Sequence, residues 1–323
     1  MTAPLALVVG GSGFLGKHIC AAFTGHGWQV ISVSRRARAV PGCTSVGVRP
    51  HGAYAQFQEL IDETSPQVVV NAAGAVWQPT ENDLQLANVE CADAVTRAVA
   101  GGRKPTRLIH LGSSLEYAPR PRGQPTPEST PTTPTSAYGR SKLAGSRLVL
   151  AAARGPGIDA VVLRVFNAIG PGQPASSMLG RAVAELKRAQ AHGVRARLEL
   201  THQERDFVDV RDVAEAVRLS AVARAPVLPP VVNIGRGEAA TTATLLGALV
   251  KISGVPADVR MGGYPDGPRG NALSWQRADI NLAGRALGWR PRTALPTTLH
   301  DLWCSAPGHP HDDSEPTGER ASQ

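Results

Sequence analysis

Aromatic side chains, cysteines and long apolar runs are all scarce in this chain of 323 residues. Aromatic residues make up only 4% of it, which argues against the stacking platforms that hold single-stranded nucleic acids. Its four cysteines, which have no paired spacing, are Cys20, Cys43, Cys91 and Cys304. Neither a metal site nor a disulfide framework is therefore expected, and a reducing compartment fits. No apolar run is long enough to cross a bilayer, so we expect no membrane partner.

Basic residues outnumber acidic ones, and the formal net charge is +8. The arginines are spread along the sequence rather than gathered in a stripe with aromatic residues between them, so no nucleic-acid partner is expected. The charge suits small anionic ligands such as diphosphates instead. The first expected strand begins at about Leu5 with no signal peptide before it, which favours a cytoplasmic location.

A short apolar run, Leu5–Val9, is followed by a glycine-rich segment. This order predicts a strand, a tight turn and a helix. Such a turn lets the backbone approach a pyrophosphate, which then lies on the positive N-terminus of the helix. The alternative is a tight turn without a ligand. The residues that we expect to bind a dinucleotide cofactor are Gly10, Gly13, Phe14, Leu15 and Gly16.

The next expected strand, 29–33, ends at Ser34, and Arg35 and Arg36 follow it. A site for NAD usually has an Asp or Glu at this point, which holds the 2′-hydroxyl of the ribose. A carboxylate would repel the 2′-phosphate of NADP, whereas two arginines attract it through charge-assisted hydrogen bonds. We therefore expect Arg35 and Arg36 to select NADP(H), with NAD as the alternative if the arginines are merely solvated.

Two further buried strands end in small or hydroxyl-bearing residues. The strand 67–71 leads into Ala72 and Ala73, which leave room for a cofactor to lie close. The strand 107–111 leads into Ser113. In a doubly wound sheet, ligands bind outside the carboxyl ends of the strands, so the Ser113 hydroxyl is placed to donate to a substrate carbonyl. A serine in this position also often only caps the turn that follows.

Tyr138 and Lys142 are four residues apart in a segment that reads as a helix. On a helix this spacing places both side chains on one face, about 5.4 Å apart along the axis. A phenol beside an ammonium group has its ionised form stabilised, so we expect its pKa to fall below the ordinary value of about 10. Such a phenol can protonate the alkoxide that forms when a hydride reaches a ketone. The alternative is a surface pair without a chemical role.

Strands and helices alternate up to the strand 160–166, which predicts an α/β fold built on a Rossmann-type doubly wound parallel sheet. A loop rich in Pro, Thr and Arg, 119–134, is expected over the site. Beyond residue 166 the alternation loosens, and we expect a smaller, interleaved C-terminal substrate-binding lobe. The helix after the strand at about 204–209 is expected to be capped by Asp212.

The expected division of the chain has three parts. The NADP-binding Rossmann domain is 1–166, and the segment 207–236 returns to it. The substrate-binding lobe is 167–206 together with 237–303. The last residues, 304–323, are rich in Pro, Gly, His and acids without periodicity, and are expected to be a disordered tail.

Six motifs occur in an order that is typical of one family. They are Gly10-x-x-Gly13-x-x-Gly16, Ser113 at its strand end, Tyr138-x-x-x-Lys142, Arg164-x-x-Asn167-x-x-Gly-Pro-Gly, Arg205-Asp-Phe-Val-x-Val-x-Asp212 and Leu287-Gly-Trp-Arg-Pro291. Over roughly its first 303 residues the chain resembles the extended short-chain dehydrogenases/reductases. The segments around Ser113 and Asn167 look most like those of reductases of GDP-4-keto-6-deoxymannose and related 4-keto-6-deoxy sugars.

This resemblance implies roles for individual residues. Ser113 and Tyr138 would hydrogen-bond the C4 oxygen of the sugar, with Ser114 beside them, and Lys142 would hold the nicotinamide ribose. The residues implied to hold the nucleotide and diphosphate of the substrate are Asn167, Arg181 and Arg205. The implied activity is the NADPH-dependent reduction of the 4-keto group of a nucleotide-diphospho-4-keto-6-deoxyhexose. A homodimer through two packed helices is the partner that the resemblance adds.

Other functions remain open at this point. Sugar 4,6-dehydratases of the family carry Asp-Glu after the Ser or Thr, and Ser114-Leu115 stands here, which excludes that reaction because Leu115 cannot move a proton. A nucleotide-sugar 4-epimerase is the first alternative, although Arg35 and Arg36 weaken it. Reduction of a non-sugar ketone is the second, since Trp77 and the loop 119–134 could shape such a pocket. A cofactor-sensing regulatory protein is the third, and it would usually lack the Tyr-Lys pair.

Overall fold

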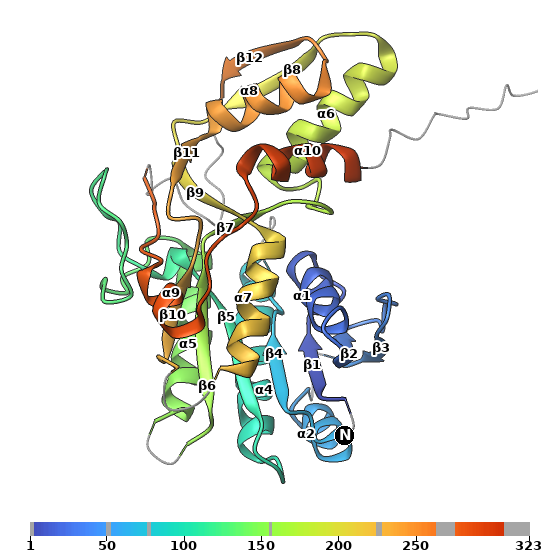
Figure 1. The fold of residues 1–323 in the computed structure, drawn as a ribbon, viewed down its shortest axis with the longest axis vertical. Coiled ribbons are helices and arrows are strands. Elements are labelled where there is room, and N and C mark those ends of the chain that lie inside the picture. The colour runs from blue at the N-terminus through green and yellow to red at the C-terminus, as the bar shows by residue number, and fades with distance from the viewer. Residues whose placement is uncertain are drawn as a thin grey trace, which may run out of the picture.

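A parallel sheet of seven strands forms the centre of the larger part of the molecule (Figure 1), and the computed structural model describes residues 3–49, 53–75, 79–154, 157–223, 228–262 and 275–306. The strand order is β10-β6-β5-β4-β1-β2-β3. The strands are β1 (Leu5–Val9), β2 (Gln29–Ser34), β3 (Thr44–Gly47), β4 (Val68–Asn71), β5 (Arg107–Ser113), β6 (Ala160–Val165) and β10 (Val231–Ile234). All of their pairings are parallel, which confirms the expected doubly wound sheet.

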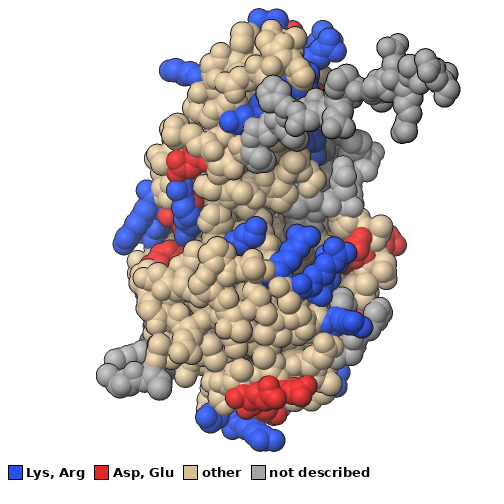
Figure 2. Space-filling view, turned by 90° about the vertical axis from the view of Figure 1, so that its right-hand side faces the viewer, with Lys and Arg blue, Asp and Glu red and all other residues tan. Residues whose placement is uncertain are grey.

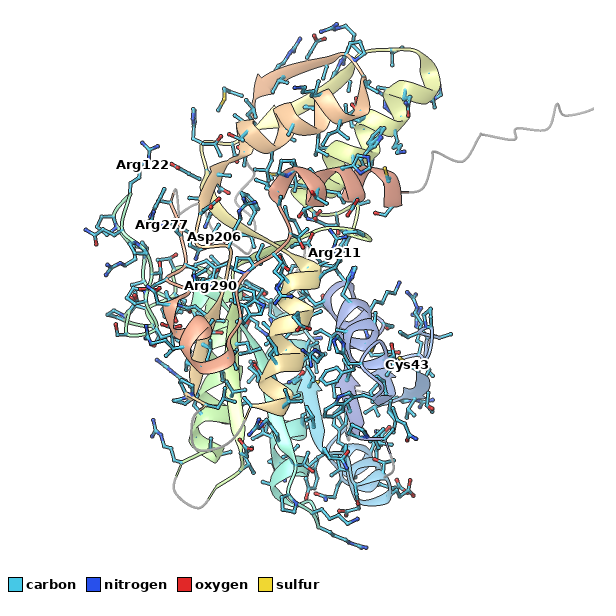
Figure 3. All side chains as sticks on the ribbon, in the orientation of Figure 1. Cys43, Arg122, Asp206, Arg211, Arg277 and Arg290 are labelled. Atoms are coloured by element: carbon cyan, nitrogen blue, oxygen red, sulfur yellow. The ribbon has the colours of Figure 1, made fainter. Side chains whose placement is uncertain are left out.

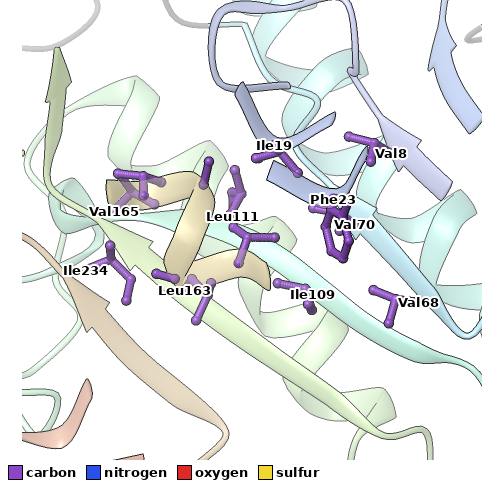
Figure 4. Packing of buried hydrophobic residues seen from close by; sticks show 14 of the residues in the cluster. Val8, Ile19, Phe23, Val68, Val70, Ile109, Leu111, Leu163, Val165 and Ile234 are labelled. Atoms are coloured by element: carbon purple, nitrogen blue, oxygen red, sulfur yellow. The ribbon is translucent and has the colours of Figure 1, made fainter. Parts of the chain in front are cut away.

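Helices cover both faces of this sheet, because successive strand residues point to opposite sides. On one face the strands contribute residues such as Val8, Val70 and Ile109, which pack against α1 (Phe14–Thr24), α7 (Val210–Val222) and α9 (Asn281–Leu287) (Figure 4). On the other face Leu7, Val69 and Leu108 pack against α2 (Ala53–Thr64), α4 (Cys91–Ala100) and α5 (Ala137–Ala152). Burial on both faces explains why the strands are apolar along their whole length.

Short helical segments lie beside two of these helices. The turn α3 (Glu81–Leu84) continues through the π-helical turn η1 (Gln85–Glu90) into α4, so the helix predicted around 83–100 contains one wider turn. The 3₁₀ turn η2 (Ser114–Glu116) follows β5 directly. Among the described helices, none is both long and apolar enough to span a membrane.

A smaller lobe lies above the carboxyl ends of the large sheet (Figure 1). It contains the sheet β11-β9-β7 and the pair β12-β8. The strands are β7 (Asn167–Ile169), β8 (Ala196–Leu200), β9 (Glu204–Asp209), β11 (Ala239–Thr241) and β12 (Ala257–Met261), and the helices are α6 (Met178–His192), α8 (Thr242–Ser253) and α10 (Leu295–Ser305). A separate apolar core joins these helices, with Leu186, Leu245 and Leu299 at its centre.

Three details differ from the boundaries expected from sequence. Helix α9 lies with the larger domain rather than the lobe, because Ala283, Leu287 and Trp289 are buried in the core of that domain. β9 pairs with β7 and β11, so the return to the large sheet begins with α7 rather than at residue 207. Cys304 and Ser305 belong to α10, and the tail from residue 307 onward lies outside the described residues, as does Trp77.

The expected cap of α7 is also wrong. Asp209, not Asp212, is the N-cap, and its carboxylate accepts a hydrogen bond of 2.7 Å from the Arg211 N–H. Asp212 lies in the first turn, where its carboxylate accepts from the N–H groups of Arg292 and Thr293 at 3.1 and 2.9 Å. Either aspartate could cap a helix by residue type. Asp212 does not, because its carboxylate accepts hydrogen bonds from the distant segment 292–293 instead.

Candidate active site

The glycine-rich turn after β1 is packed so tightly that side chains cannot replace its glycines. Gly10 has a φ of +82°, and a Cβ there would lie 2.7 Å from the Ala73 nitrogen. A Cβ on Gly16 would lie 2.0 Å from the Gly10 oxygen. Helix α1 begins at Phe14, and its N-cap Gly13 supplies no side-chain cap. The N-terminal N–H groups of α1 thus suit a phosphate, and the predicted Ala72 and Ala73 lie against the same turn.

Arg35 and Arg36 follow the end of β2 and are exposed. Hydrogen bonds from Thr80, and in addition the charge of Arg35, lower the pKa of Asp83 in α3. Arg35 therefore lies near enough to α3 for its charge to act on Asp83. Figure 2 shows Lys and Arg side chains gathered near the middle of the face that lies on the right-hand side of Figure 1. The guanidinium groups of Arg35 and Arg36 have the hydrogen-bond donors and the charge that fit a ribose 2′-phosphate.

Ser113, Tyr138 and Lys142 are brought together where β5 ends and α5 begins. Ser113 is the last residue of β5, and its hydroxyl oxygen accepts from the Leu115 N–H at 3.2 Å. Helix α5 is capped by Ser136, whose oxygen accepts from the Gly139 N–H at 3.0 Å. A Cβ on Gly139 would lie 2.3 Å from the Leu115 oxygen, so α5 starts directly against the turn that follows Ser113.

Lys142 is buried beneath this site, with 4% of its surface exposed, and Tyr138 is 8% exposed. The Lys142 Nζ lies 4.0 Å from the position that a Cβ on Gly74 would occupy, beside the end of β4. Burial lowers the pKa of Lys142, and Glu116 and Cys91 oppose that change. Perturbed pKa values of this kind, caused by burial together with a specific charged partner, are typical of functional sites.

Asn88 is a site residue that the sequence interpretation missed. It is buried in the π-helical turn, where its Oδ1 accepts from the Ala75 N–H at 3.1 Å. Its Nδ2 donates to the Ser141 oxygen at 2.9 Å, and the Ser141 hydroxyl donates to the Tyr138 carbonyl at 2.9 Å. Asn88 thereby ties the segment after β4 to the first turn of α5. A π-helical turn often marks a functional site, but nothing in the local sequence signals it.

Gln276 was missed as well, and it links two predicted substrate residues. The Ser114 hydroxyl donates to the Gln276 Oε1 at 3.1 Å, and the Gln276 Nε2 donates to the Ser114 carbonyl at 3.2 Å. The Asn167 Nδ2 donates to the Asp206 carbonyl at 2.9 Å and to the Gln276 Oε1 at 3.4 Å. Ser114 and Asn167 thus lie in one polar cluster next to Ser113.

The two predicted substrate arginines lie in different parts of the lobe. Arg205 is buried on β9, beside Ala240 of β11. Arg181 is exposed on α6, and its Nη1 donates to the Ser176 carbonyl at 2.8 Å. It lines a cavity of about 390 Å³ between α6 and β8, together with Arg188 and Arg197. Guanidinium groups around a cavity suit a phosphate-bearing ligand.

Asp206 connects several chain segments that meet above the site (Figure 3). Its carboxylate accepts hydrogen bonds from the N–H groups of Arg236, Gly237 and Ala278 at 2.6, 2.9 and 3.0 Å. Burial raises the pKa of Asp206 to about 6, against the opposing effect of these donors. The carboxylate therefore joins β9, the turn after β10 and the segment that carries Gln276. Among the described residues, no cluster of His, Cys, Asp and Glu could hold a metal ion.

Known proteins resemble this chain in sequence and in fold. The sequence profile of the NAD dependent epimerase/dehydratase family matches residues 6–235. The chain belongs to this family. A relative from Kitasatospora kifunensis, dTDP-6-deoxy-L-talose 4-dehydrogenase (NAD(P)(+)), is 39% identical over 307 residues, which span 94% of this chain and 96% of the relative. The resemblance to extended short-chain dehydrogenases/reductases is thus confirmed at the level of the family.

Solved structures of similar fold include complexes with nucleotides. One is MoeE5 in complex with UDP-glucose and NAD, with a TM-score of 0.78, 27% identity, and coverage of 93% of this chain and 97% of that one. Another is RMD from Pseudomonas aeruginosa complexed with NADPH, with a TM-score of 0.78, 23% identity, and coverage of 94% and 97%. The similarity over nearly the whole of each chain confirms the expected fold class.

Proposed function

We propose that this protein reduces the 4-keto group of a dTDP-linked 4-keto-6-deoxyhexose, with NADP(H) as the preferred cofactor and NAD(H) as the alternative. The observation that carries the proposal is the buried pair Tyr138 and Lys142, held against the turn that follows Ser113. The relative from Kitasatospora kifunensis supports the choice of sugar and nucleotide, because its name specifies a dTDP-6-deoxyhexose oxidised at C4 and either cofactor.

The residues of the larger domain fit a dinucleotide. Only glycine suits the left-handed backbone of Gly10 against Ala73, and the N-terminus of α1 offers N–H groups to a pyrophosphate. When bound, the reduced nicotinamide supplies the hydride. Lys142, beside the end of β4, would hold the nicotinamide ribose, and Arg35 and Arg36 would hold the 2′-phosphate. The lobe, with Arg181 at its cavity, would take the nucleotide diphosphate of the sugar.

The protein's own groups complete the reaction at the C4 oxygen. Ser113 would donate a hydrogen bond to that oxygen and so stabilise the negative charge that develops on it. The Tyr138 hydroxyl would then give its proton to the oxygen, which turns the ketone into an alcohol. The Lys142 ammonium stabilises the phenolate that remains. Leu115 cannot act as an acid or base, so elimination of water is not part of the proposal.

The first experiment is to measure NADPH oxidation by the purified protein with dTDP-, GDP- and UDP-linked 4-keto-6-deoxy sugars offered in turn. We expect consumption with the dTDP sugar, and NMR of the product should give the configuration at C4. No consumption with any of the three would overturn the proposal. A protein that is purified with cofactor bound, and that interconverts C4 epimers without added cofactor, would be a 4-epimerase. Reduction of other ketones only would favour a non-sugar substrate.

A further inference from the structure

Glu116 is a fully buried carboxylate directly behind the site, at the end of the turn η2. One oxygen accepts from the Ser113 N–H at 2.7 Å and from the Ser146 hydroxyl at 2.9 Å. The other accepts from the Arg164 Nε at 2.8 Å. A buried charge is stable only when it is paired and hydrogen-bonded, and here three donors from β5, α5 and β6 meet this one group.

The donor on α5 belongs to the same face as the proposed catalytic residues. Tyr138, Lys142 and Ser146 follow one another at intervals of four residues, and all three are buried. Residues at this interval lie one above the other on a helix. One oxygen of the Glu116 carboxylate accepts hydrogen bonds both from Ser146, at one end of this row, and from the backbone N–H of Ser113. It therefore fixes the position of Ser113 relative to the helix that carries Tyr138 and Lys142.

Gly112 of β5 leaves room for the Glu116 carboxylate because it has no side chain. A Cβ on Gly112 would lie 2.7 Å from the Glu116 Oε1 and 3.2 Å from the Ser146 oxygen. Any side chain at position 112 would therefore displace the carboxylate or the helix. Gly112 has no left-handed backbone conformation, so glycine is needed there because Glu116 and also the Val162 Cγ1, at 2.9 Å from such a Cβ, approach closely.

Glu116 also balances the charges beneath the site. Arg164 is buried, is paired with Glu116 and lies over the Tyr117 ring at 4.3 Å. The charge of Glu116 also acts on Lys142, whose other titratable neighbours include Tyr138 one turn away on α5, Cys91 on α4 and His110 on β5. Burial and the Lys142 charge lower the pKa of His110, so that imidazole is neutral. Glu116 is the carboxylate that stabilises the charged form of Lys142.

We infer that Glu116 is a positioning residue for the reduction: it fixes Ser113 against α5 and places a negative charge behind the row that contains Lys142, without contact with substrate or cofactor. This inference rests on the proposed function for its kinetic consequences. Its electrostatic part concerns only Lys142 and can be measured without any substrate.

The test is Glu116→Gln, which keeps the shape of the side chain and an acceptor for the Ser113 N–H but removes the charge. With one opposite charge lost, we expect Lys142 to titrate about one pH unit lower or more. The chain contains five lysines, so ¹³C-lysine NMR can follow their titration, with Lys142 assigned by the signal that disappears in Lys142→Arg. An unchanged Lys142 titration would overturn the inference, whatever the substrate of the enzyme is.

Kinetics give the second readout. We expect kcat for the keto sugar to fall by about 10- to 100-fold in Glu116→Gln, with KM changed by less than about threefold because substrate contacts remain. The alkaline limb of kcat should move to lower pH by the same amount as the NMR titration. A raised KM with unchanged kcat would contradict a positioning role. If the Lys142 titration shifts but the protein reduces none of the sugars, the proposed function is wrong. The inference that the Glu116 charge acts on Lys142 would still hold.

Two further variants separate positioning from folding. Glu116→Gln leaves Arg164 buried without its partner, which destabilises the fold. Glu116→Gln combined with Arg164→Met removes both charges, and should recover thermal stability while Lys142 still titrates below its value in the unmodified protein. The matched control is Glu128→Gln: that carboxylate accepts from the Asn233 N–H at 2.9 Å, and the Asn233 Oδ1 in turn accepts from the Tyr117 hydroxyl at 2.7 Å. It should leave the Lys142 titration unchanged; an equal shift in both variants would overturn the inference.

Discussion

The site beneath α5 and the cavity of the lobe place their charged groups in opposite ways. Around α5, Lys142, Arg164 and Glu116 are buried, and Arg164 donates a hydrogen bond of 2.8 Å to Glu116. In the lobe, Arg181 and Arg188 line an accessible cavity and make contacts with neighbouring residues of their own helix or loop. Buried charges are few and must be balanced, whereas exposed ones can rearrange around a ligand at little cost. The protein therefore fixes the groups proposed for proton transfer, whereas Arg181, which is proposed to bind phosphate, is exposed and able to rearrange.

Tyr138→Phe should have the largest effect, because it removes the proposed proton donor from the rigid site. We expect kcat to fall by at least about 100-fold, the usual contribution of a positioned general acid. Cofactor binding should remain, since the ring is kept. Steady-state kinetics and a fluorescence titration with NADPH check both parts. Near-normal turnover in the variant would mean that another group supplies the proton.

The pH dependence of the unmodified enzyme tests whether burial affects this site as described. Burial lowers the pKa of Lys142, so its ammonium group loses its proton at a lower pH than an exposed lysine. The protonated form is needed for reduction, and kcat should therefore fall as pH rises through that lowered value, by up to about tenfold per pH unit. The measurement is kcat at saturating substrate from neutral to alkaline pH. A decline that begins only at the value of an exposed lysine would contradict it.

Arg35→Asp addresses the accessible charges at the cofactor end. A carboxylate repels a 2′-phosphate and accepts from a ribose hydroxyl, so preference for NADPH over NADH should fall by about tenfold or more. The ratio of kcat/KM values for the two cofactors measures the change. Arg38→Asp is the control, because Arg38 is an exposed arginine of the same segment. A similar change in both variants would reflect only the general charge of the loop.

Arg181→Ala should have the smallest effect, because adaptable neighbours surround it in the lobe. We expect KM for the dTDP sugar to rise by about three- to tenfold with kcat nearly constant. Arg195→Ala is the matched control: Arg195 forms an exposed ion pair of 2.8 Å with Asp258 in the same lobe, and should change neither constant beyond about twofold. A large loss of kcat in Arg181→Ala would show that the lobe contributes to the chemical step as well.

Short-range patterns were sufficient for much of the large domain. The apolar run before Gly10, the arginines after β2 and the pair Tyr138 and Lys142 are each defined within one strand, turn or helix. Local periodicity and turn chemistry decide such features. The parallel sheet followed from the alternation of strands and helices, because buried parallel strands read as continuous apolar runs.

The sheet, the glycine-rich turn and the spacing of Tyr138 and Lys142 could thus be predicted, since each depends on residues that are neighbours in the chain. Three features depend instead on how distant segments pack: Gln276 reaches Ser114, α9 joins the larger domain, and Asp209 rather than Asp212 caps α7. The same packing brings donors from three elements to Glu116. The physical reason is that a buried polar group must find partners wherever the fold brings donors to it, and those partners lie up to 162 residues away.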